Sequence, residues 1–386
     1  MAEGPHESAR GGVGPVWFDA HLDLAYLGVS GRELTLPLDQ LDDSDRIHEG
    51  PPAVTLPALR DAGMRLALGT IFTEPDGEGP AAYPAGDAFG AHEAGRAQLE
   101  YYHTLFGSGQ LGLARWTEEG RLRVHINDPD GSIPPDDYEA ETGEMRAAIA
   151  DVPGSFPLAI GILMENADPI GSPDTLEWWV ERGLAAVGMA WAHPSRYAGG
   201  NESDLGLTDL GKELVIAMDA LRVVHDVSHL CDRAVDDLLE ATDRPVMASH
   251  SNCRALLYPS AGVGEHQRHL RDDVIKEIAG RGGVIGLNLF GPFVRSEPGP
   301  PTVDDAVAHV ERICDLTGST DCVGLGSDMD GGFGSDMLPR GIDTPTGLRA
   351  LWDALRLRGW SRDELVRFTH GNWLRFFERA TRAASA

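Results

Sequence analysis

The chain has 386 residues, and its 61 acidic residues outnumber its 32 lysines and arginines, which gives a formal net charge of −29. Such an acidic surface disfavours nucleic acids and anionic membranes as partners, because both are themselves negatively charged. The hydrophobic share of 42% allows a full core, and no stretch approaches the roughly 18 uninterrupted apolar residues of a membrane span.

The N-terminal segment and the cysteines indicate the cellular compartment in which the protein is expected. Residues 1–14 are polar and rich in glycine, and they predict a flexible N-terminal tail, not a signal peptide. The four cysteines form no C-x-x-C pair, which disfavours a thiolate zinc site and fits the reducing cytoplasm. We therefore expect a cytoplasmic protein in which residues 15–380 form the folded domain.

Short apolar runs recur along the chain, with helical spacing between most of them. Eight such runs predict strands at residues 16–24, 64–72, 157–164, 184–192, 221–229, 245–250, 283–290 and 322–328. Helices are predicted at residues 91–106, 173–182, 208–220, 231–241, 271–281, 303–316, 344–357 and 362–378. Good N-cap residues precede three of these helices, namely Ser172, Thr208 and Thr302.

Strands that alternate with helices predict a parallel sheet, and eight such units predict closure into a (β/α)₈ TIM-type barrel. The alternative is an open doubly wound sheet, which is disfavoured because no G-x-G-x-x-G follows the first strand. Between the second and third strands lie a Pro- and Gly-rich loop at 74–87 and a polar strand candidate at 121–126. We interpret this passage as an elaborated excursion from a single barrel domain.

Ligand-type side chains stand at the carboxyl ends of the predicted strands, where barrel enzymes carry their active sites. His21 and Asp23 are two residues apart, so both can face one metal ion. Glu165 follows the third strand, and its two oxygens suit a bridge between metals about 3.5–4 Å apart. His229 and His250 end neighbouring strands and predict the ligands of a second metal. Each residue alone could be structural, but their joint occurrence favours a metal site.

Two more residues at strand ends predict the chemistry. Asp328 is the last residue of the eighth predicted strand, in the motif CVGLGSDMDGG, and it is the candidate general base. His193 follows the fourth strand and could donate to a developing oxyanion. Asp330 is expected either to orient ligands or to stabilise the turn, and His225 is expected deeper along its strand.

The motifs HLD, MEN, DVSH, SHSN and GLGSDMDGG together resemble the membrane (renal) dipeptidase family of zinc metallopeptidases, within the amidohydrolase-like barrel enzymes. The resemblance implies that a hydroxide bridging two zinc ions hydrolyses dipeptides, with tolerance of a D-residue at the C-terminal position. It implies a catalytic acid/base at Asp328 and a carbonyl-polarising, substrate-binding group at His193. The implied zinc ligands are His21, Asp23, Glu165, His229 and His250, with Glu165 between the ions.

The resemblance also implies an arginine that binds the substrate carboxylate, a role for which the guanidinium fork is suited. Arg268 fits that place best, with Arg254 and Arg271 as alternatives, because the segment before Arg268 is longer than in the family. In addition, His269 stands where the family has asparagine. Family members are often dimers, so a homodimer is a candidate assembly, although the sequence carries no interface signal.

Three functions follow from these observations. The first is a metal-dependent dipeptidase with two zinc ions, although other divalent metals also suit the ligands. The second keeps the barrel and the dinuclear site but acts on a non-dipeptide amide, lactam or lactone. The third is a metal-binding interaction protein without catalysis, which is disfavoured because every expected ligand and Asp328 are present.

Overall fold

The computed structural model describes residues 15–127, 138–140 and 157–383. The tail predicted at residues 1–14 lies outside this part of the chain, and the domain boundaries stay a prediction.

The predicted eight-stranded parallel barrel is confirmed. The strands follow the order β11-β10-β9-β8-β2-β1-β13-β12, and each overlaps one of the predicted apolar runs. Ala248, directly after β11, pairs in parallel with Ile285 of β12. The N–H of Ala248 donates to the carbonyl of Val284 at 3.0 Å, so the two ends of the sheet meet. The barrel strands are β1 (Trp17–Leu22), β2 (Met64–Phe72), β8 (Leu158–Glu165), β9 (Leu184–Gly188), β10 (Val224–Asp226), β11 (Val246–Met247), β12 (Ile285–Leu287) and β13 (Val323–Leu325).

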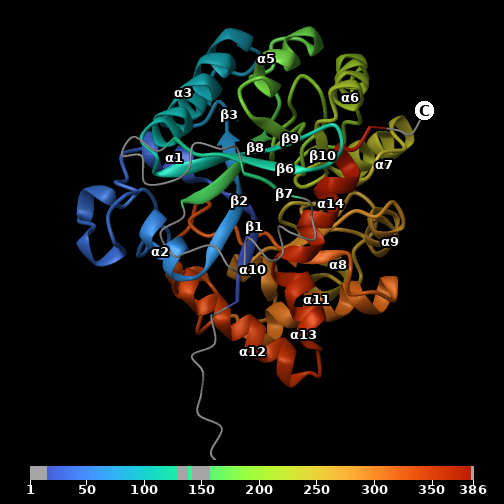
Figure 1. Cartoon of the computed structure of the whole chain (residues 1–386). Helices are drawn as coiled ribbons and strands as arrows, with labels where there is room; N and C mark the ends of the chain where they lie inside the picture. The colour runs from blue at the N-terminus through green and yellow to red at the C-terminus, as the bar shows by residue number, and fades with distance from the viewer. Residues whose placement is uncertain (1–14, 128–137, 141–156, 384–386) are drawn as a thin grey trace, which may run out of the picture.

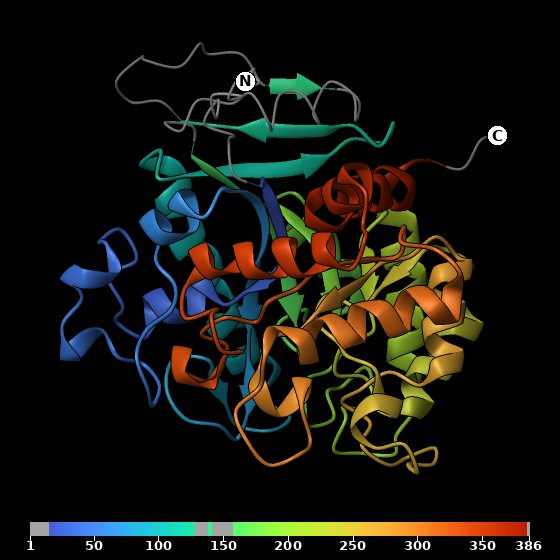
Figure 2. The same ribbon diagram turned by 90° about the horizontal axis from the view of Figure 1, so that it is seen from below.

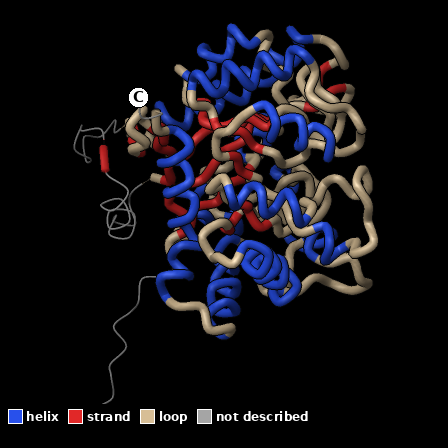
Figure 3. The backbone as a smooth tube through the Cα atoms, turned by 90° about the vertical axis from the view of Figure 1, so that its right-hand side faces the viewer, coloured by secondary structure: helices blue, strands red, loops and turns tan. Residues whose placement is uncertain are grey.

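Helices surround the strands (Figures 1 and 3). Two of the predicted caps bond as expected: Thr208 Oγ1 accepts from the N–H of Gly211 at 3.0 Å and Thr302 Oγ1 from the N–H of Asp305 at 3.2 Å. In the described parts of the chain, no helix has the length and hydrophobicity that a bilayer crossing requires. The helices are α1 (Leu24–Val29), α2 (Leu56–Asp61), α3 (Ala88–Gly107), α5 (Leu176–Val180), α6 (Asp209–Leu221), α7 (Asp232–Ala241), α8 (Arg254–Leu257), α9 (Asp272–Gly280), α10 (Gly291–Val294), α11 (Val303–Thr317), α12 (Arg349–Leu357), α13 (Arg362–Val366) and α14 (Asn372–Thr381).

The last predicted helix, at 362–378, is divided in the structure. A π-helical turn, Arg367–Gly371, separates α13 from α14. Helix α14 then packs against the amino-terminal end of the barrel: Trp373 Nε1 donates to the carbonyl of Leu325 at 2.9 Å, and Phe377 stacks on Phe18 with ring centroids 6.0 Å apart. The aromatic rings of α14 therefore belong to the apolar cluster inside the barrel, which leaves the carboxyl-terminal end for chemistry.

The excursion between the second and third barrel strands contains more strand than the sequence predicts. It holds β3 (Glu74–Pro75), β4 (Ala82–Tyr83), β5 (Leu111–Trp116), β6 (Leu122–His125) and β7 (Tyr138–Ala140). Strand β6 matches the predicted strand, whereas β5 was not predicted because its run LGLARW is short and mixes glycine and arginine with apolar residues. The first three residues of β5 pair in parallel with β8, and β6 pairs antiparallel with β5. Strands β5–β7 form a layer beside α14 at one end of the barrel (Figure 2).

A bulge in β1 changes which way its side chains point. The pairing of β1 with β2 shifts register between Asp19 and Leu22. Ala20 packs inside the barrel, whereas Leu22 packs in the cluster that includes the surrounding helices. A strict two-residue alternation would put both on one face, so the shift reverses the alternation. His21 and Asp23 are thereby aimed at the centre of the barrel mouth, which is a recurring use of bulges beside active sites.

Candidate active site

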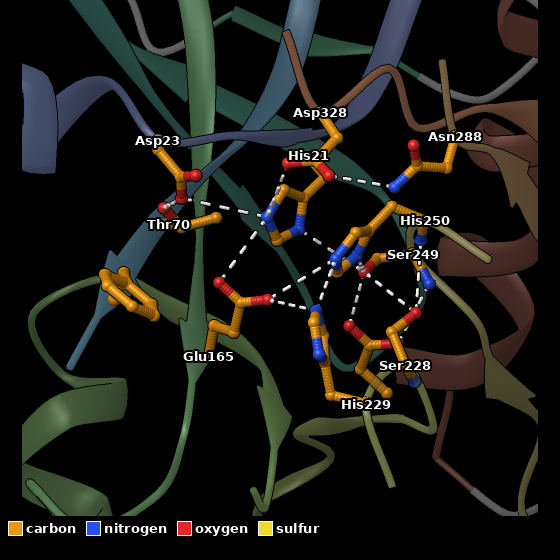
Figure 4. A network of polar contacts seen from close by, with 12 residues as sticks. His21, Asp23, Thr70, Glu165, Ser228, His229, Ser249, His250, Asn288 and Asp328 are labelled. Carbon is orange, nitrogen blue, oxygen red and sulfur yellow. Dashed lines mark hydrogen bonds and ion pairs between the residues drawn. The ribbon is translucent and has the colours of Figure 1, made fainter. Parts of the chain in front are cut away.

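Six ligand-type side chains from five strand ends converge at the carboxyl-terminal mouth of the barrel (Figure 4). Each is at most 9% exposed. Strand β1 contributes two of them, and β8, β10, β11 and β13 contribute one each. They are His21, Asp23, Glu165, His229, His250 and Asp328.

Glu165 lies at the centre of this cluster. Its Oε2 is 3.6 Å from His21 Nε2, and its Oε1 is 3.1 Å from His229 Nε2 and 3.4 Å from His250 Nε2. Asp23 Oδ1 lies 3.7 Å from His21 Nε2 on the other side. Donor atoms within 4.8 Å of one another form two sets that share Glu165, one with His21 and Asp23 and one with His229 and His250. A carboxylate in two ligand sets is the arrangement expected between two metal ions.

A third set combines His21, His250 and Asp328. Asp328 Oδ1 lies 3.9 Å from His21 Nε2, and Asp328 Oδ2 accepts a hydrogen bond from Asn288 Nδ2 at 2.8 Å. Asp328 therefore has one oxygen held by the protein and one that faces the cluster.

The hydrogen bonds of the histidines decide which ring nitrogen carries the proton. The single hydroxyl proton of Ser249 is donated to Asp226 Oδ2 at 2.5 Å, so Ser249 Oγ accepts from His250 Nδ1 at 2.8 Å. Asn201 Oδ1 can only accept, so His229 Nδ1, 3.0 Å away, donates to it. Both rings therefore turn an unprotonated Nε2 toward the cluster, as metal-ligating histidines do.

The lone pairs on these Nε2 atoms show whether the residues fit a metal ion. His229 Nε2 and His250 Nε2 lie 2.9 Å apart without a proton to share. Glu165 Oε1, buried between them, has no hydrogen-bond partner among the described residues. Three lone-pair atoms that face one another are stable when a cation lies among them, and imidazole with carboxylate suits zinc and similar divalent ions. The donor set therefore fits a metal.

Burial shifts the pKa values of the histidines and carboxyl groups in the cluster, and these shifts agree with a metal site. It lowers the pKa of His21 to about 3, and it lowers the pKa values of His229 and His250 well below their ordinary value. The imidazoles are therefore neutral, which is the form that binds metals. Burial, with repulsion from Asp23, raises the pKa values of Glu165 and Asp328 well above their ordinary range. Among the described residues, these carboxyl groups thus lack a cationic partner strong enough to offset their burial.

Two backbone positions at the site adopt the left-handed region that non-glycine residues rarely occupy. The φ angles of His229 and Asp328 are +67° and +60°. Such conformations cost about 1–3 kcal/mol each and collect at functional sites. Asp330 also has a positive φ, of +63°, but its Oδ2 accepts from Arg32 Nη1 at 2.5 Å and from the N–H of Val54 at 2.6 Å. Asp330 therefore anchors neighbouring loops.

A cavity of about 410 Å³ opens above the cluster. Its base contains Asp23, Glu165, His229, His250 and Asp328, and Arg268 lines its side. Aromatic side chains complete the wall, which is typical of sites for small molecules. The aromatic rings that line it are Tyr26, Phe72, Trp191, Phe290, Phe293 and Phe333.

The structure separates the three candidate arginines. Arg254 forms a two-pronged ion pair with Asp232, with N–O distances of 2.8 and 2.6 Å. Arg271 pairs with Asp236 at 2.6 Å. Arg268 lines the cavity, bonding only Ser251 Oγ at 3.1 Å and the carbonyl of His250 at 2.9 Å among the described residues.

His193 is not brought into the cluster. Its side chain is 49% exposed, and its Nδ1 lies 3.5 Å from Glu202 Oε2. The loop after β9 places Trp191 on the cavity wall and carries His193 outward beyond it. The catalytic role of His193 stays a prediction.

The side chains that hold the ligands were not predicted from the sequence. Asp23 Oδ1 accepts from Thr70 Oγ1, and Asn201, Ser249 and Asn288 bond His229, His250 and Asp328 as described above. Thr70 and Asn288 could have been noticed, because each is a polar residue inside an apolar run at a strand end. Asn201 carries no such signal, since it lies in a polar loop.

Residues 143–386, more than half of the chain, match the family described as membrane dipeptidase (peptidase family M19), and the chain belongs to this family. An uncharacterized dipeptidase of Schizosaccharomyces pombe is 29% identical over 212 residues, which are 54% of this chain and 49% of that protein. A second one from the same yeast is 38% identical over 134 residues, 34% of this chain and 30% of that protein. The chain thus spans about half or less of the length of these curated relatives.

Solved structures share the fold. A metallopeptidase called dipeptidase AC superposes with a TM-score of 0.73 and 24% identity, covering 96% of this chain and 100% of that one. A metallopeptidase from Rhodobacter sphaeroides, solved with a phosphinate mimic of the dipeptide L-Ala-D-Ala, gives 0.71 and 24%, covering 95% and 100%. These likenesses support the barrel assignment.

Proposed function

We propose that the protein is a metal-dependent dipeptidase. The observation that carries this proposal is the set of facing lone pairs on His229, His250 and Glu165 at the base of one cavity. Membership of the dipeptidase family supports it, and so does the dipeptide mimic bound by the R. sphaeroides relative.

His21 and Asp23 would hold one ion and His229 and His250 the other, with Glu165 contacting both. When bound, two zinc ions would activate a water nucleophile at neutral pH and polarise the scissile carbonyl. Zinc is the metal expected for this mixture of nitrogen and oxygen ligands, and other divalent ions are alternatives.

Asp328 would transfer the proton. Its Oδ2 is held by Asn288, so its Oδ1 is oriented toward the cluster. A carboxyl group with a raised pKa suits a base that takes a proton from the attacking water and returns it to the leaving amine. We keep His193 as the donor to the oxyanion, a role that requires its loop to turn the ring inward.

Arg268 would bind the carboxylate of the substrate. Arg268 lines the cavity and forms no direct ion pair with a carboxylate among the described residues, which favours a substrate with a free carboxylate. This observation also favours a dipeptide over a lactam, a lactone or another amide. We further propose tolerance of a D-residue at the C-terminal position, supported by the family resemblance and by the L-Ala-D-Ala mimic in the relative.

The test is a screen of L–L and L–D dipeptides, with metal content measured by elemental analysis before and after chelation. We expect up to two zinc ions per chain and hydrolysis that disappears on chelation and returns with zinc. Hydrolysis that persists after complete metal removal contradicts the metal role. Activity on a lactone or lactam, with none on any dipeptide, favours the alternative substrate.

A further inference from the structure

One wall of the cavity is a row of aromatic rings that leads to a carboxylate. The Phe72 ring meets that of Tyr26 edge-on, with centroids 5.5 Å apart, and that of Trp191 at 5.1 Å. Trp191 in turn contacts the ring of His229 at 5.9 Å. Glu74, two residues after Phe72, lines the same cavity. The row therefore connects the metal cluster with an acidic side chain.

The Glu74 carboxylate forms no ion pair with a lysine or arginine in the part of the chain that the structure describes. It is half-buried, and among the described residues no side chain donates a hydrogen bond to it. The nearby imidazole of His193 already lies 3.5 Å from Glu202. Burial outweighs the attraction of His193 and raises the pKa of Glu74. A positively charged ligand group would satisfy this carboxylate.

The position of Glu74 is set by a network at the end of β8. The side chain of Asn166, directly after Glu165, donates from Nδ2 to the carbonyl of Thr73 at 2.9 Å and to Tyr83 Oη at 2.8 Å. Strand β3, which carries Glu74, pairs with β4, which carries Tyr83. The Tyr83 hydroxyl donates to Asp168 Oδ2 at 2.6 Å. Both strands are thus tied to the element that supplies the central carboxylate of the cluster.

Glu74 and Arg268 act on different parts of the cavity. The guanidinium of Arg268 lies 5.1 Å from the ring centroid of Phe293. Glu74 instead follows Phe72, whose ring contacts those of Tyr26 and Trp191. The cavity therefore offers a cationic group among one set of aromatic rings and an anionic group among another. This arrangement matches a substrate that carries a carboxylate at one end and a cation at the other.

We propose that Glu74, with Tyr26, Phe72 and Trp191, forms the subsite for a cationic nitrogen on the N-terminal residue of the substrate. The inference rests on the proposed dipeptidase function, in which Arg268 holds the other end. Aromatic faces together with a carboxylate recognise ammonium and guanidinium groups. That nitrogen belongs either to a basic side chain or to the α-amino group.

A matched series of three compounds distinguishes these sources: L-Lys-D-Ala, L-norleucyl-D-Ala, which lacks the ε-amine, and hexanoyl-D-Ala, which lacks both amines. Glu74→Gln removes the charge and keeps the shape. If the side chain is bound, kcat/KM falls about tenfold for the lysyl compound alone, chiefly through KM. If the α-amino group is bound, both dipeptides lose about tenfold relative to hexanoyl-D-Ala.

The control is Glu78→Gln, an exposed acid in the same loop that does not line the cavity, and it should change none of the three ratios. Equal loss for all three compounds, or no loss for any, overturns the assignment of Glu74. If the wild-type protein cleaves dipeptides but Glu74→Gln leaves the ratios unchanged, only this inference is wrong. If the metal-loaded wild-type protein cleaves none of a full dipeptide panel, the proposed function fails, and the subsite fails with it.

Discussion

Replacing Arg268 by methionine tests how the substrate is held. The side chain of methionine keeps part of the apolar contact with Phe293 but removes the charge and the donors. Arg268 uses one N–H of Nη1 for Ser251 and one of Nη2 for His250. Each Nη group has a second N–H, so one or two charge-assisted hydrogen bonds can reach a carboxylate. At about 1.5–3 kcal/mol for each such bond, the loss is about 1.5 kcal/mol for one weak bond and about 6 kcal/mol for two strong ones, or about 10- to 20,000-fold in kcat/KM.

The assay is steady-state hydrolysis of one dipeptide, with metal content and melting temperature measured in parallel. The loss should appear mainly in KM, because a carboxylate remote from the reacting bond is held in both the ground state and the transition state. Metal content should not change, since Arg268 is not one of the five residues proposed to hold the ions. Arg271→Met is the matched control, because Arg271 is paired with Asp236 and does not line the cavity. The reasoning is refuted if both variants change KM alike, or if Arg268→Met leaves KM unchanged.

Three further predictions concern the metal, the base and the core. Chelation should lower the melting temperature as well as abolish activity, because the facing lone pairs lose their cation; calorimetry with and without zinc checks this. Asp328→Asn should keep the metal content while reducing kcat about 100- to 10,000-fold; an unchanged kcat would remove the base from that position. Burial lowers the pKa of His309 to about 4, so His309 stays neutral in the fold while the unfolded chain takes up a proton near pH 6.5. Stability should therefore fall by up to about 3 kcal/mol between pH 6.5 and 4, and His309→Gln should reduce this slope in denaturant titrations; equal slopes in the two proteins would contradict it.

Much of the barrel could be predicted because each strand and helix has a recognisable pattern within its own stretch of sequence. The eight strands are apolar runs of the length and composition of buried parallel strands, and the helices between them repeat with helical spacing and begin at good caps. Parallel strands put their carboxyl ends on one face, so residues as distant in the chain as His21 and His250 could be expected to meet. The six residues of the cluster were all found in this way.

The parts that escaped prediction depend on contacts between distant segments. Strand β5 forms by pairing with the start of β8 and with β6, and a run that mixes polar and apolar residues does not reveal such partners. Thr70, Asn201 and Asn288 hold the ligands through side-chain hydrogen bonds across the barrel mouth, which no local pattern encodes.

The identities of the ligand residues and their place at the strand ends were readable in the amino-acid order, because strand and helix periodicity are local properties. The folded chain alone decided how they are aimed. The register shift in β1 turns His21 and Asp23 inward, and the pairing of Arg254 with Asp232 and of Arg271 with Asp236 leaves Arg268 as the arginine that lines the cavity. The loop after β9 leaves His193 exposed. The direction of each ligand side chain and the pairing of each arginine depend on residues from other parts of the chain. These residues come into contact only once the barrel has closed.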